Sequence, residues 1–106
     1  MSYSQKIVKF TDLNSWQEAH SLTLLIYKTT STFPKEEVFG LTSQIRRAAV
    51  SVESCIAEGF SRYHYKDRTT FYYDARGSLA EVESQITTAK DLGYLSHDVF
   101  TNIILQ

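Results

Sequence analysis

The sequence has a single cysteine, a single proline and four glycines among its 106 residues. One cysteine cannot form an intramolecular disulfide, and we expect Cys55 to act as a small buried apolar residue in a reducing compartment. No sustained alternation of apolar and polar residues occurs, and no Asn-Gly or Asp-Gly hairpin turn is present. The sequence therefore gives no indication of a β-sheet.

Strong charge and long apolar runs are also missing. The formal net charge is −1 and the isoelectric point is about 6.3, whereas a nucleic-acid-binding domain often has an isoelectric point above ~9. Any contact with nucleic acid must therefore rest on a local patch. No apolar run approaches the ~20 residues that span a bilayer, and residues 1–10 lack the apolar core of a signal peptide. We expect a cytoplasmic protein that does not contact a membrane.

The chain is organised around residues 40–59, where Gly40 and Gly59 enclose eighteen residues without proline or glycine. The apolar residues of this stretch recur at spacings of three and four, which is typical of one helix face packed on a core. They are Leu41, Ile45, Ala48, Val52 and Ile56. Length and pattern predict a flexible lead-in over residues 1–11 and a single helical domain over residues 12–106.

Three further helices are predicted, the first from Asp12 or Asn14 to about Thr32. The apolar arc of this helix exceeds half its circumference, so we expect a partner subunit to cover the surplus, and the alternative is that Leu22 and Leu25 are simply exposed. The next predicted helix covers about residues 67–92 and carries a strip of small residues. Such a strip either allows another helix to approach closely or is a plain solvent-exposed face. A short fourth helix follows Gly93, with Ser96 as its N-cap. The candidate oligomer-interface residues are Leu22, Leu25, Phe33, Val50, Ala57, Tyr73, Gly77, Ala80 and Ser84.

Several motifs together resemble a known family. They are Leu13-x-x-Trp16-Gln17-x-Ala19-His20, Phe33-Pro34-x-Glu36, Gly40-Leu41-Thr42-x-Gln44-Ile45-Arg46-Arg47-Ala48-Ala49, Ile56-Ala57-Glu58-Gly59, Gly77-Ser78-Leu79-x-Glu81 and Leu92-Gly93-Tyr94-Leu95. The pattern resembles the 23S rRNA intervening-sequence proteins, whose fold also serves accessory proteins of diversity-generating retroelements. The resemblance implies an up-down-up-down four-helix bundle that forms a ring, commonly a homopentamer.

The chain departs from the family pattern in two places. The family usually has Pro where this chain has Glu53, and Asn where it has Cys55, so we expect a straighter second helix here. The fourth helix that the resemblance implies is also longer than the residues that remain after Ser96.

Basic residues occur at positions 46–47 of the central stretch, and basic and aromatic residues are interleaved in the segment 62–68 that follows it. Arginine binds phosphate in a bidentate manner and tyrosine stacks on unpaired bases, so these residues are a candidate nucleic-acid-binding set. The alternative is a solvated helix end with salt bridges between subunits. The candidate residues are Arg46, Arg47, Arg62, Tyr63, His64, Tyr65, Lys66 and Arg68.

No catalytic or metal-ligating motif is recognisable. The three histidines are far apart, and neither His-Glu-x-x-His nor Cys-x-x-Cys occurs. We expect His20 to pack beside Trp16. The sequence therefore predicts no cofactor and no enzyme activity. It favours an oligomeric bundle that contacts RNA or DNA, and the alternative is a scaffold or accessory subunit for a protein partner, such as a reverse transcriptase.

Overall fold

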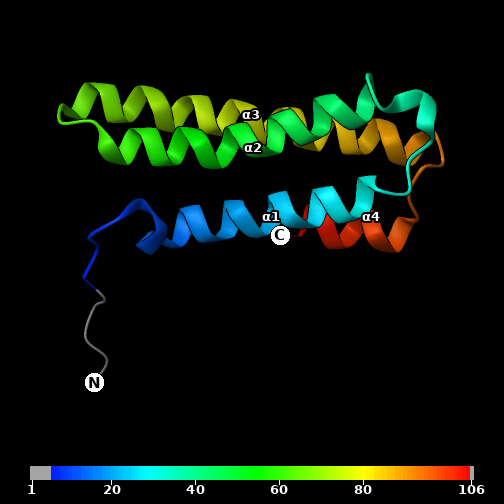
Figure 1. Cartoon of the computed structure of the whole chain (residues 1–106), viewed down its shortest axis with the longest axis horizontal. Helices are drawn as coiled ribbons and strands as arrows, with labels where there is room; N and C mark the ends of the chain where they lie inside the picture. The colour runs from blue at the N-terminus through cyan, green and yellow to red at the C-terminus, as the bar shows by residue number, and fades with distance from the viewer. Residues whose placement is uncertain (1–5, 106) are drawn as a thin grey trace.

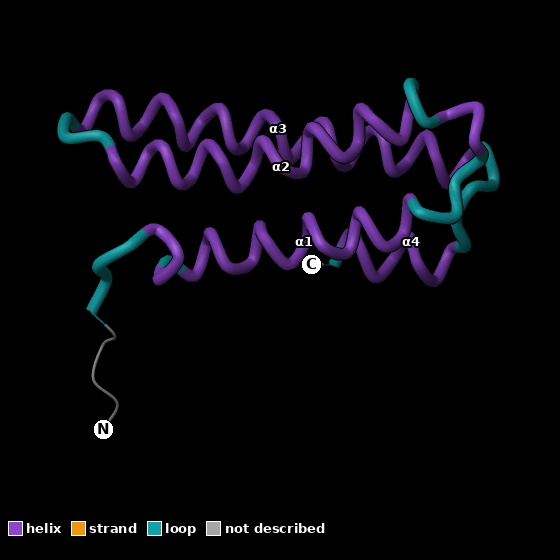
Figure 2. The backbone as a smooth tube through the Cα atoms, viewed as in Figure 1, coloured by secondary structure: helices purple, strands orange, loops and turns teal. Residues whose placement is uncertain are grey.

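The structure is a computed structural model that describes residues 6–105 of the chain. Every regular element in this range is a helix (Figure 2), which confirms the predicted all-α fold. The elements are η1 (Phe10–Asp12), α1 (Asn14–Thr30), η2 (Lys35–Glu37), α2 (Leu41–Ser61), α3 (Tyr65–Asp91) and α4 (His97–Ile104). The predicted lead-in falls partly on residues 1–5, which lie outside the described residues.

The four α-helices form a bundle in which α2 and α3 lie on one side and α1 and α4 on the other (Figure 1). The turn between α2 and α3 lies at one end of the bundle, and the turns that precede α2 and α4 lie at the opposite end. With only 8 residues against 27 in α3, α4 extends along part of the bundle only. The predicted bundle with a short fourth helix is confirmed.

Two groups of buried apolar residues fill the bundle. The larger group draws on all four helices, and Ile26, Ile45 and Ile86 within it are fully buried. A smaller group lies in the half of the bundle that α4 does not reach, where Ala19, Val52 and Ile56 meet α3. The apolar stripe predicted on residues 41–56 thus faces the core, with Leu41 at its edge.

The rest of the chain covers part of the surplus apolar surface of α1, whereas Leu24 and Tyr27 stay exposed. Leu22 is buried, and Leu25 packs against the core cluster that includes Ile103 of α4. Phe33, in the turn after α1, is also buried and its ring lies 5.4 Å from the ring of Tyr94. Leu22 and Phe33 therefore belong to the internal core rather than to a contact with a second copy, because α4 supplies the second surface that α1 needs.

Several helix ends differ from the predicted ones. The N-cap residue of α1 is Leu13, and not Asp12 or Asn14. The Asp12 carboxylate instead accepts hydrogen bonds from the Val8 and Lys9 N–H groups at 2.9 and 3.0 Å. Gly40 is the N-cap of α2, which begins at Leu41 and is separate from the preceding η2 turn.

The predicted boundary between α3 and α4 is confirmed. Gly93 has a φ of 81°, in the left-handed region that glycine adopts at low cost. The Ser96 hydroxyl accepts a hydrogen bond from the Val99 N–H at 3.2 Å and so caps α4.

Candidate nucleic-acid interface

The eight candidate nucleic-acid-binding residues do not form one patch. Arg46 and Arg47 lie in the second turn of α2, whereas the other six begin at the residue after its last turn. Arg47 and Arg62 are fifteen positions apart in the sequence, which at a rise of 1.5 Å per residue is about 22 Å along the helix. The sequence prediction of a single basic-aromatic patch is therefore wrong, because a continuous helix holds its two parts at opposite ends.

The segment Arg62–Arg68, which joins α2 to α3, holds its two arginines through local contacts. The Arg62 guanidinium lies 4.7 Å from the centroid of the Phe71 ring and 3.4 Å from the Glu58 carboxylate, the pair expected from their spacing. Arg68 Nε donates a hydrogen bond to the Arg62 carbonyl at 2.6 Å. These contacts fix the path of the turn.

The aromatic residues of this segment project into solvent. Tyr63 and Tyr65 are 89% and 82% exposed, and the Tyr63 ring meets the His64 ring edge-on at 5.2 Å. Lys66 is exposed beside them. The segment thus presents tyrosine faces and positive charge together, although Asp67 in the first turn of α3 offsets part of that charge.

The histidine nearest the core makes a contact that the sequence did not reveal. The His20 ring stacks on Trp16 with centroids 4.6 Å apart, as its expected packing implies, and Nδ1 lies 3.1 Å from the Glu53 carboxylate. Glu53 occupies the position where the resemblance places proline, and α2 runs through it unbroken. Within residues 6–105, no group of three or more metal-ligating side chains could hold a metal ion.

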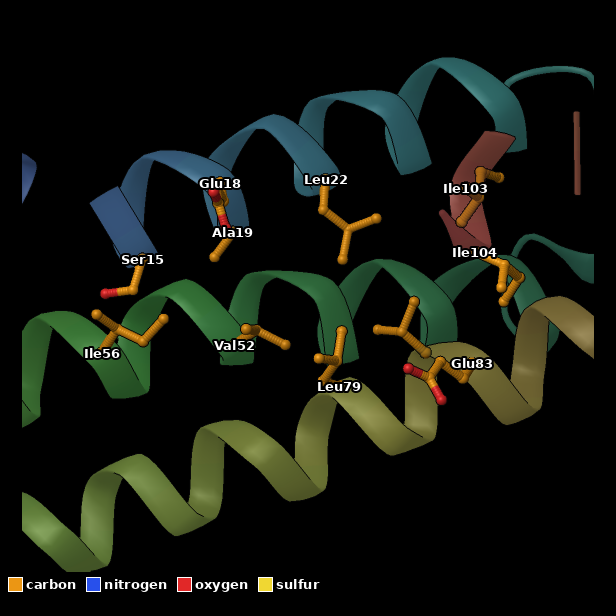
Figure 3. Close-up of a pocket in the computed structure, with 11 residues that line it drawn as sticks. Ser15, Glu18, Ala19, Leu22, Val52, Ile56, Leu79, Glu83, Ile103 and Ile104 are labelled. Atoms are coloured by element: carbon orange, nitrogen blue, oxygen red, sulfur yellow. The ribbon is translucent and has the colours of Figure 1, made fainter. Parts of the chain in front are cut away.

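An apolar groove lies between α1 and α3 beyond the end of α4 (Figure 3). Its volume is about 220 Å³, and Leu22, Val52 and Ile56 contribute apolar side chains to it. Glu18 and Glu83 stand on its α1 and α3 sides. Sequence reasoning missed this groove, because it depends on where α4 stops relative to its neighbours.

The remaining candidate interface residues lie on the outer surfaces of the α2–α3 hairpin. Tyr73, Gly77, Ala80 and Ser84 are all exposed on α3, and no atom lies within 4 Å of the position that a Gly77 side chain would occupy. On α2, Val50 is exposed and Ala57 is half-buried.

These features define a small antiparallel helical bundle with an exposed basic-aromatic turn. The sequence profile of the 23S rRNA-intervening sequence protein family matches residues 11–106. The chain belongs to this family, as its sequence motifs indicated. A comparison with curated proteins finds no match. None of the described helices is both long and apolar enough to cross a membrane.

Proposed function

We propose that this chain is a non-enzymatic, oligomeric helical-bundle protein that contacts single-stranded RNA or DNA through Arg62–Arg68. The observation that carries the proposal is the exposure of Tyr63 and Tyr65 beside Lys66. A base stacked on an exposed aromatic ring contributes about 1–3 kcal/mol of binding free energy, and cationic side chains add a salt-dependent attraction to phosphate.

Fluorescence anisotropy with labelled single-stranded RNA and DNA tests this proposal. Replacing both Tyr63 and Tyr65 with alanine should weaken binding at least about tenfold, since two stacking contacts are lost. Phe39→Ala is the matched control, because Phe39 is 97% exposed and belongs to the turn before α2. That turn lies at the opposite end of the bundle from the turn between α2 and α3 (Figure 1). The proposal would be refuted if the binding affinity did not fall as the salt concentration rises. It would also be refuted if Phe39→Ala weakened binding as much as the double replacement of Tyr63 and Tyr65.

Oligomerisation would repeat the Arg62–Arg68 turn around a symmetry axis. The few positive charges of each copy would then form a ring of positive charge. We propose that the α3 strip of Tyr73, Gly77, Ala80 and Ser84 forms the contact, and the resemblance favours a pentamer. The support is that three residues of this strip, Gly77, Ala80 and Ser84, are small and exposed and so permit close helix approach. Light scattering should then give a mass several times that of one chain, and Ala80→Arg should reduce it. The matched control is Ser21→Arg on exposed α1 surface.

The second candidate function is a scaffold or accessory subunit that binds a protein partner. The apolar groove between α1 and α3 favours it, because the exposed side chains of Leu79 and Ile104 line this groove. A partner captured with the chain after nuclease treatment, and lost when Leu79 is replaced by glutamate, would support this alternative over nucleic-acid binding.

A further inference from the structure

Three cationic side chains line a second groove, which lies where the end of α1, η2 and the start of α2 meet. The groove has a volume of about 570 Å³, and Lys35, Arg46 and Arg47 contribute to its walls. All its lining residues are neutral or basic. In the part of the chain that the structure describes, none of the three cations forms a salt bridge. Their positive charge is therefore not compensated by direct ion pairing.

Arg46 is held in place before any ligand arrives. Its guanidinium lies 4.6 Å from the centroid of the Tyr27 ring, and its Nε donates a hydrogen bond to the Thr30 hydroxyl at 2.8 Å. Its Nη2 donates a longer bond of 3.4 Å to the Tyr27 carbonyl. A guanidinium fixed in this way loses little side-chain entropy when it binds an anion, and its remaining N–H groups suit paired phosphate oxygens.

A buried hydroxyl in the same wall has no partner. Thr42 lines the groove and is 6% exposed, yet its Oγ1 makes no hydrogen bond within the described residues. An unpaired buried hydroxyl is unfavourable, and a rotation of the Thr42 side chain toward a ligand oxygen in the groove would give it a partner. The Thr42 hydroxyl itself is enclosed by protein, so the three cations are the groups that a ligand in the groove would meet directly.

The nearby carboxylates leave the groove positive. Glu37 is already engaged, because its two oxygens accept hydrogen bonds from the Leu41 N–H and the Tyr94 hydroxyl. Glu36 is exposed on η2 and does not line the groove. Arg47 also borders a neighbouring hollow that contains Glu81 of α3, and no salt bridge joins the two.

We propose that this groove binds a phosphate group, with Arg46 as the preset ligand and Arg47 and Lys35 as mobile ones. The ligand is either free phosphate or a phosphate ester, including one in a nucleic-acid strand. The proposal goes beyond the stacking role of Tyr63 and Tyr65, and it stands if that turn binds nothing.

A titration of ¹⁵N-labelled protein with inorganic phosphate tests the site, with sodium chloride holding the ionic strength constant. We expect saturable shifts of the Arg46 Nε signal and of the Thr42 backbone amide. The double variant Lys35→Gln and Arg47→Gln should bind about tenfold more weakly, since it loses two charged hydrogen-bond donors. Arg76→Gln, which removes an exposed cation outside the groove, should bind as the parent does.

The outcome is decided by where the shifts occur and what causes them. Equal shifts with chloride alone, shifts outside the groove, or equal loss in the Arg76→Gln variant would overturn the proposal. Phosphate binding retained after Tyr63 and Tyr65 are replaced with alanine separates this site from the proposed function. A uridine dinucleotide that binds more tightly than phosphate identifies a strand as the source, and the reverse order identifies free phosphate.

Discussion

Two glycines show how differently the same residue type is used in this chain. Gly59 is buried within α2, where an added Cβ would lie 2.7 Å from the Tyr72 ring and 3.2 Å from the Phe71 Cβ. Gly77 lies in α3 with nothing within 4 Å of its added Cβ. The first glycine allows α2 and α3 to approach, whereas the second has no packing role within one chain.

Gly59→Val should therefore destabilise the fold by about 2 kcal/mol, because extra methyl groups overpack the contact between α2 and α3. The free energy of unfolding from urea denaturation measures the effect. Gly59→Ala should cost less, since a smaller group intrudes. A valine variant as stable as the parent would mean that the two helices separate easily at this point.

Gly77→Ala should stabilise an isolated chain by about 0.5–1 kcal/mol, the difference in helix propensity between the two residues. The same substitution should give less stabilisation, or a loss, if a second copy packs against Gly77. Denaturation midpoints measured across protein concentrations therefore test stability and the proposed α3 interface together.

At the scale of elements, the turn before α4 is tied to η2 by a hydrogen bond of 2.8 Å from the Tyr94 hydroxyl to the Glu37 carboxylate. This hydrogen bond is the main reason that the pKa of Glu37 lies below its ordinary value of 4.5, and the hydrogen bond from the Leu41 N–H lowers it further. The same bond raises the pKa of Tyr94. Both shifts mean that folding favours the ionised carboxylate and the protonated phenol.

The sign of the pH effect follows from these shifts. A carboxyl group with a lowered folded pKa stabilises the fold fully above its unfolded pKa, and this contribution is lost as the pH falls through the folded pKa. Tyr94→Phe should thus be destabilising at neutral pH and progressively less so under acid conditions. Urea denaturation of both proteins from about pH 7 down to about pH 3 covers this window. If the difference in unfolding free energy between the two proteins stayed constant over this pH range, the Tyr94 hydrogen bond would not be what lowers the pKa of Glu37.

The docking of α4 also depends on its cap. Removing the Ser96 hydroxyl with Ser96→Ala should cost about 1 kcal/mol, because the Val99 N–H loses its partner. Amide hydrogen exchange should then quicken in α4 more than in α2. Ser54→Ala on the exposed surface of α2 is the control and should leave α4 unchanged.

At the scale of the whole molecule, the bundle is elongated and thin, with a longest Cα extent of 43 Å and a shortest of 17 Å (Figure 1). It is therefore a slab rather than a sphere. A slab buries less of its surface than a sphere, so association of copies would add stability that one chain lacks.

Residue spacing, glycine and serine act locally, so the helical class, the core stripe on α2, the turn at Gly93 and the cap at Ser96 could all be predicted from the sequence. Family motifs added the bundle topology. Only the tertiary structure separated Arg46 and Arg47 from Arg62, turned Leu22 and Phe33 inward, and brought Glu53 to His20. These outcomes depend on which helices become neighbours and where α4 ends, and periodicity along one helix carries no information about its partners.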